Sequence, residues 1–166
     1  LTRGHPLWTD MARELWQQGL RTGRPLSLSE IRQGLHSRAG AEWLYGLIID
    51  RLAEPLKTAA RYAPLLRRFN QESLNACLPD AAARLDDVAF RTLIGRSFVE
   101  QRGRFWACHD LVRGAQITWL RQQHPADFDR FQQRAAAFFA ARWQARHEKE
   151  DLLEALYHRF WADEEA

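Results

Sequence analysis

The sequence lacks a long hydrophobic run. No stretch approaches the roughly 18 consecutive apolar residues that a membrane-spanning helix needs, and no basic segment followed by an apolar stretch marks a signal peptide. Cysteine is also scarce, because Cys77 and Cys108 are the only two and do not form a CxxC pair. We therefore expect no membrane partner, a cytoplasmic location and two buried thiols.

Lysine is nearly absent. Lys57 and Lys149 are the only lysines among 24 basic residues, and 21 acidic residues leave a net charge of +3. We attribute the arginine bias first to genome composition and only second to a need for forked guanidinium contacts. The charge excess is too small to indicate a nucleic-acid surface by itself. With 46% hydrophobic residues, the chain has enough apolar side chains for one compact core or two small ones.

Common catalytic and metal-binding motifs are absent as well. The sequence has no GxxxxGK[ST] phosphate loop, no GxSxG elbow and no HExxH pair, and its six histidines are scattered without ligand spacing. We predict that this segment is not an enzyme and has no catalytic residue, no metal site and no cofactor of its own. Because the chain starts at Leu1 and its single methionine is Met11, we expect it to be a piece of a longer protein.

Apolar residues at helical spacing predict a small helical domain over residues 1–56. The pattern indicates one helix over residues 6–20 and another around residues 43–52. Between them, Ser27 and Glu30 have the spacing of a capping box that opens a short third helix.

Residues 57–124 have the element order of a winged-helix domain. Three helical patterns are followed by two short β-prone runs around Gly103 and then by a further helix. Asn70 is a suitable N-cap, and Pro64 predicts a kink or an earlier end in the first helix. The predicted elements are helices over 58–68, 71–78 and 85–94, strands over 98–101 and 105–108, and a helix over 110–123.

Residues 125–166 show two amphipathic helices rich in aromatic residues. Their apolar positions recur every three or four residues, which indicates core packing rather than a cofactor site. We predict the helical hairpin of a TPR-like array, with one apolar face exposed and available for self-association. The predicted fold class is therefore mainly α: a small helical domain, a winged helix with one β-hairpin, and then a helical hairpin.

Four arginines concentrate positive charge near the predicted wing. They are suited either to phosphate contacts of a DNA-binding winged helix or to a solvated or interdomain face. Asp86 and Asp87 open the helix that would contact bases, which favours the second interpretation. The four residues are Arg91, Arg96, Arg102 and Arg104.

Two short motifs lie at the start of the chain and directly after the predicted hairpin. The first is Gly4-His5-Pro6-Leu7, and the second is Cys108-His109-Asp110. They resemble the Gly-x-Pro and Met-His-Asp motifs of the STAND signal-transduction ATPases, a class that includes bacterial regulators and the NB-ARC and NACHT proteins. Residues 43–52 and 65–70 and the helices after residue 125 also resemble segments of this class.

The resemblance implies a nucleotide-controlled switch. Pro6 would pack beside the adenine of ADP held by an upstream domain, and His109 would reach the β-phosphate. Gly4 and His5 would support the site, while Asp110 would orient His109 or serve as the N-cap of the following helix. We expect ADP or ATP with Mg²⁺ in the full-length protein, and as partners the upstream nucleotide-binding domain and the downstream repeat domain of the same chain.

Our first hypothesis is therefore a regulatory, non-catalytic segment of a bacterial STAND-type ATPase. It would couple the bound nucleotide to conformational change and assembly in signalling. The alternative is a DNA-binding winged-helix transcription regulator, for which duplex binding would depend steeply on salt. A third hypothesis is a plain helical interaction scaffold.

Overall fold

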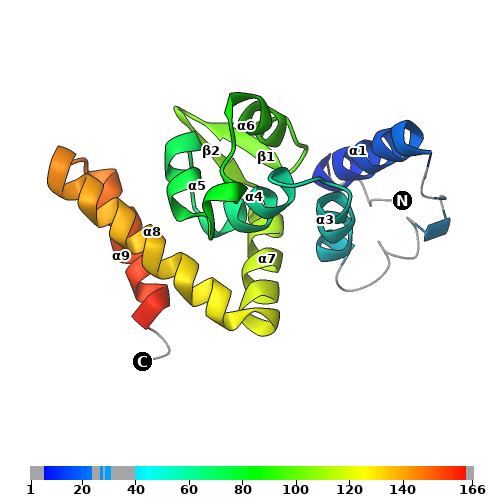
Figure 1. Cartoon of the computed structure of the whole chain (residues 1–166). Helices are drawn as coiled ribbons and strands as arrows, with labels where there is room; N and C mark the ends of the chain where they lie inside the picture. The colour runs from blue at the N-terminus through cyan, green and yellow to red at the C-terminus, as the bar shows by residue number, and fades with distance from the viewer. Residues whose placement is uncertain (1–5, 24–26, 28, 31–39, 164–166) are drawn as a thin grey trace.

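The computed structural model describes residues 6–23, 27, 29–30 and 40–163. Over these residues the chain is mainly helical, with one two-stranded antiparallel sheet, as the sequence predicts. Helices α1 (Pro6–Thr22) and α3 (Gly40–Asp50) lie at one side of the molecule in Figure 1. Helices α8 (Pro125–Arg146) and α9 (Lys149–Asp163) lie at the other.

The first helix buries the apolar stripe that its sequence indicates. Leu7, Met11 and Leu15 recur at spacings of four, and all three are buried. Farther on, Ser27 and Glu30 form the predicted capping box: the Ser27 backbone N–H donates to the Glu30 carboxylate, and the Glu30 N–H donates to the Ser27 hydroxyl. The remainder of the helix predicted there lies outside the described residues.

The middle of the chain carries the elements predicted for a winged helix. Helix α4 (Leu56–Tyr62) ends before Pro64, which lies in a 3₁₀ turn over Ala63–Leu65, so the helix is shorter than predicted. Helix α5 (Gln71–Cys77) is capped by Asn70, whose side chain accepts from the Ser73 N–H at 2.8 Å. After a 3₁₀ turn at Ala81–Ala83 follow α6 (Asp87–Ile94) and, beyond the hairpin, α7 (Asp110–Gln123).

The β-hairpin pairs β1 (Val99–Arg102) with β2 (Phe105–Cys108). Gly103 occupies the turn with a φ of 64°, a conformation that favours glycine. On its other edge, β2 exchanges two backbone hydrogen bonds with Phe69: the Phe69 N–H donates to the Trp106 carbonyl at 2.7 Å, and the reverse bond is 2.8 Å. Phe69 lies in the segment between α4 and α5, so this pairing fixes the hairpin to that segment.

The last two helices form an antiparallel hairpin. Helix α8 (Pro125–Arg146) ends at His147, which adopts a left-handed conformation, and α9 (Lys149–Asp163) returns alongside α8 (Figure 1). Helix α8 also packs against α5 and α7.

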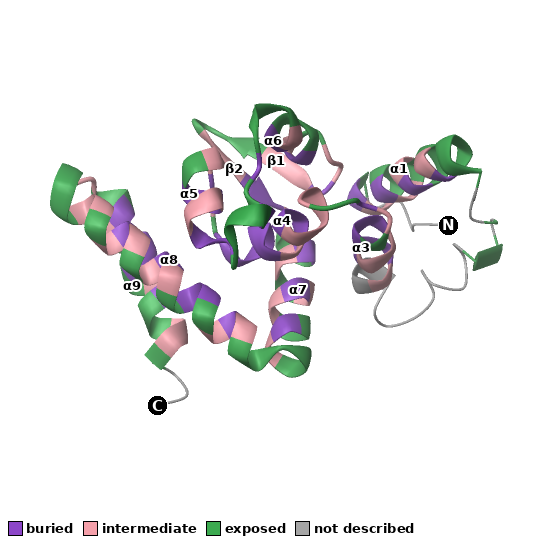
Figure 2. Cartoon of the chain, in the orientation of Figure 1, coloured by how far each residue is buried: buried purple, intermediate pink, exposed green. Residues whose placement is uncertain are grey.

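The buried apolar residues form one cluster that extends from Leu7 to Ala155. Figure 2 shows them on the sides of the helices that face neighbouring elements. Aromatic contacts connect the three predicted regions: Tyr45 of α3 meets Phe98 edge to face, and Tyr62 of α4 stacks on Phe131 of α8. No helix among the described residues is long and apolar enough to cross a membrane.

Candidate functional site

His109 occupies the junction between β2 and α7. Its backbone N–H donates to the Phe98 carbonyl at 3.0 Å, and its own carbonyl accepts from the Arg113 N–H at 2.9 Å as part of the first turn of α7. Both bonds fix the backbone, while the imidazole is 40% exposed and its Nε2 lies 3.7 Å from Glu100 Oε2. The side chain is therefore oriented at the surface and remains accessible to a ligand.

The neighbouring Asp110 is the first residue of α7 and not its N-cap. His109 holds the N-cap position without a side-chain capping bond, so the capping role considered for Asp110 is wrong. Asp110 is exposed, and its carboxylate lies 3.9 Å from the Arg102 guanidinium, which in turn lies 2.5 Å from Glu100. We refer to Glu100, Arg102, His109 and Asp110 as the junction cluster.

Cys108 lies on the inner side of the same strand. Its side chain is buried, whereas His109 is partly exposed, as expected for neighbours at the end of a strand. Burial raises the pKa of the Cys108 thiol far above its ordinary value and that of Cys77 to about 12. Both cysteines are accordingly protonated, poorly nucleophilic core residues.

Pro6 is the first residue of α1 and is exposed. Gly4 and His5 of the same predicted motif lie outside the described residues. Pro6 and His109 belong to different elements, and within the described part of the chain no hydrogen bond or ion pair links them. The nucleotide contact expected for this pair remains a prediction.

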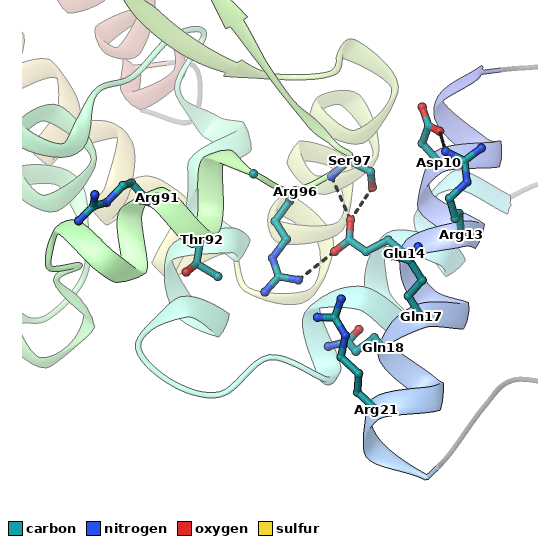
Figure 3. Close-up of a pocket in the computed structure, with 11 residues that line it drawn as sticks. Asp10, Arg13, Glu14, Gln17, Gln18, Arg21, Arg91, Thr92, Arg96 and Ser97 are labelled. Atoms are coloured by element: carbon teal, nitrogen blue, oxygen red, sulfur yellow. Dashed lines mark hydrogen bonds and ion pairs between the residues drawn. The ribbon is translucent and has the colours of Figure 1, made fainter.

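Arg96 contacts a carboxylate of the first helix. Its Nη1 donates to Glu14 Oε1 of α1 at 3.1 Å. The second oxygen of Glu14 accepts from the Ser97 backbone N–H at 2.9 Å and from the Ser97 hydroxyl at 2.7 Å. Three charge-assisted bonds to one mostly buried carboxylate therefore hold α1 to the segment between α6 and β1 (Figure 3). We call this group the Glu14 clamp.

The sequence analysis did not identify Glu14. A signal was available, because Glu14 follows the buried Leu7 and Met11 at spacings of seven and three and so lies on the inner face of α1. A carboxylate at such a position needs partners, although the sequence does not indicate which residues supply them.

The other three arginines have different surroundings. Arg104 contacts Glu148, between α8 and α9, at 2.8 Å, and so connects the hairpin turn to the C-terminal helices. Arg102 is held within the junction cluster, while Arg91 is exposed and donates to the Asp87 carbonyl of its own helix. Arg96 and Arg104 thus pair with carboxylates that are distant in the sequence, and Arg102 is already paired with carboxylates near the hairpin.

A buried polar group between α9 and the rest of the molecule was also missed. Glu154 is 3% exposed and pairs with Arg67 at 3.1 Å and Arg68 at 3.4 Å. Beside it, the fully buried His158 has its Nδ1 2.6 Å from Gln132 Oε1. In the sequence, these polar residues stand between the apolar and aromatic residues of amphipathic helices. The pattern therefore indicates core packing and gives no sign that polar residues are buried there as well.

A cleft with a volume of about 630 Å³ lies between α1 and the end of α6 (Figure 3). Its walls include the Glu14 clamp and three further arginines. Elsewhere in the described part of the chain, no group of three or more His, Cys, Asp or Glu side chains is arranged to hold a metal ion.

No protein-family model, curated protein or solved structure matches the chain. Any function must therefore be argued from the geometry of this molecule.

Proposed function

We propose that this chain is the regulatory segment of a STAND-type ATPase switch, in which nucleotide bound by an upstream domain controls the position of the winged helix. The observation that carries the proposal is the placement of Cys108-His109-Asp110. The motif falls at the junction of β2 and α7, where Cys108 is anchored in the core and His109 is 40% exposed. A histidine fixed in this way can reach a group presented by another domain.

The imidazole of His109 has suitable chemistry for a phosphate. An imidazole N–H donates to phosphate oxygens, and the bond strengthens when the ring is protonated. Glu100 lies 3.7 Å from the ring, and the guanidinium of Arg102, which pairs with Glu100, lies beside it as a further hydrogen-bond donor group. In the resting state we expect His109 to hold the β-phosphate of ADP and thereby hold the winged helix closed.

The strength of this contact limits its share in the switch. A hydrogen bond to a charged group contributes about 1.5–3 kcal/mol, whereas moving a population from almost fully closed to almost fully open requires about 5.5 kcal/mol. The remainder must come from contacts of the C-terminal helices or from assembly. Arg104 to Glu148, and Arg67 and Arg68 to Glu154, are contacts through which a stimulus on α9 would reach the winged helix.

The test is ADP binding to the full-length protein that carries this segment. We expect His109→Ala to weaken ADP binding about tenfold or more, since removing a charge-assisted bond of about 1.5 kcal/mol has this effect. His124→Ala is the matched control, because His124 is 48% exposed and also lies at the N-terminal end of a helix. Isothermal titration calorimetry gives the two affinities directly.

Equal affinity for ADP in the wild type and in His109→Ala would overturn the proposal. A further check uses the present chain alone, which lacks a phosphate loop. Its affinity for ADP through His109 should be lower than that of the full-length protein.

A further inference from the structure

The cleft between α1 and α6 is polar and contains an excess of positive charge. It is walled by one face of α1 and by the end of α6 with the three residues that follow (Figure 3). Four arginines line it against two carboxylates. The charged residues are Arg13, Arg21, Arg91, Arg96, Asp10 and Glu14.

The two carboxylates neutralise only two of the four arginines. Asp10 pairs with Arg13 at 3.2 Å, and Glu14 pairs with Arg96 at 3.1 Å. Arg21 has no carboxylate within 4.0 Å among the described residues, and its side chain points into the cleft toward that of Arg96 in Figure 3. Two guanidinium groups that approach one another repel unless an anion lies between them.

We propose that this cleft binds a small ligand through a phosphate or diphosphate group held between Arg21 and Arg96. A guanidinium carries five N–H donors in a fixed fork, and Glu14 engages only Nη1 of Arg96. Arg96 therefore has N–H donors that Glu14 does not engage, and no carboxylate among the described residues engages an N–H donor of Arg21. A phosphate dianion fits this arrangement because its oxygens accept paired N–H donors from both sides.

The shape and the acidic residues of the cleft favour a small molecule over nucleic acid. A volume of about 630 Å³ lies within the roughly 300–1,000 Å³ of small-molecule sites. Asp10 and Glu14 stand in the same cleft and would repel the successive phosphates of a long polyanion, whereas one phosphate can approach Arg21 and avoid them. Arg91 points away from Glu14 in Figure 3 and contributes to the electrostatic field without closing on the ligand.

The probe is inorganic pyrophosphate, titrated into the present chain by calorimetry at low and at physiological salt. We expect one site per chain and a loss of affinity of about tenfold in Arg21→Gln, which removes one charged donor group and leaves α1 unchanged. Arg159→Gln is the matched control, because this arginine is exposed on a helix, away from the cleft. Circular dichroism verifies that both variants are folded.

Two further titrations assign the site and its ligand. His109→Ala should bind pyrophosphate as well as the wild type, so that the cleft is distinguished from the junction cluster. A short DNA duplex should bind more weakly than pyrophosphate at physiological salt. Absence of stoichiometric pyrophosphate binding, unchanged affinity in Arg21→Gln, or duplex binding that Arg21→Gln abolishes would each overturn the small-ligand proposal.

Discussion

His158 is a histidine in an environment that opposes its protonation. Its side chain is fully buried, its ring stacks on Phe139 at 5.8 Å, and Nδ1 lies 2.6 Å from Gln132 Oε1. Desolvation by burial, together with the nearby positive charges of Arg67 and Arg113, lowers the pKa of His158 to about 3. The carboxylate of Glu154, 3.9 Å from Nε2, does not offset these effects because it is already paired with Arg67.

This shift makes the stability of the fold depend on pH. The unfolded chain protonates His158 near its ordinary pKa of 6.5, and the folded chain does so only near 3, so stability is lost as the pH falls between these values. Between pH 7 and pH 5 the loss amounts to about 2 kcal/mol. Urea unfolding at both pH values should show a smaller loss in His158→Gln than in the wild type. The exposed His124→Gln should retain the wild-type loss, and equal losses in all three proteins would contradict the assignment.

At the scale of elements, sequence reasoning worked where one local rule decides the structure. We refer to residues 57–124 as the winged region. Its last helix was predicted over residues 110–123 and has those bounds, because it starts directly after a strand and ends before a His-Pro pair. Asn70 caps α5 through the predicted side-chain bond, and Pro64 ends α4 early. Each of these features depends on residues within a few positions of one another.

Features that depend on distant residues were missed. The pairing of Phe69 with Trp106 joins positions 37 apart, and the bond from Arg96 to Glu14 joins positions 82 apart. Local periodicity does not specify which distant carboxylate pairs with which arginine, because in the sequence pattern every exposed arginine is an equally suitable partner. The same limit applies to the candidate site: the position of His109 after a strand was predictable, and its proximity to Glu100 across the hairpin was not.

Helix α9 has a second apolar face beside the one that packs in the core. Leu153, Leu156 and Phe160 are 48%, 55% and 63% exposed and recur at spacings of three and four. The sequence pattern predicted such an exposed apolar face. We expect it to drive weak self-association of this chain, and Leu156→Ser with Phe160→Ser to shift the chain toward monomer in sedimentation velocity. Leu111→Ser, which alters a 46% exposed leucine on α7, should leave self-association unchanged.

At the scale of the whole molecule, the contact between α1 and the segment that joins α6 to β1 differs from the rest of the core. Leu7, Met11 and Leu15 connect α1 to the common apolar cluster, but the bonds from α1 to Arg96 and Ser97 all converge on Glu14. Apolar contacts tolerate small displacements, whereas three hydrogen bonds to one carboxylate require one geometry. The Glu14 clamp therefore sets the position of α1 relative to the winged region.

Neutralising Glu14 should loosen this connection selectively. Glu14→Gln keeps the shape of the side chain, weakens the bond to Arg96 and leaves a mostly buried guanidinium without its counter-charge, which costs about 1–3 kcal/mol of stability. Asp10→Asn is the matched control on the same helix: its ion pair with Arg13 is exposed on both sides and contributes about 0–1 kcal/mol. Native-state hydrogen exchange should show faster exchange in α1 for Glu14→Gln, with α8 and α9 unchanged. Both substitutions remove one negative charge from α1, but of the two residues only Glu14 bonds to the winged region. If α1 exchanged equally fast in both variants, apolar packing rather than the Glu14 clamp would determine the position of α1.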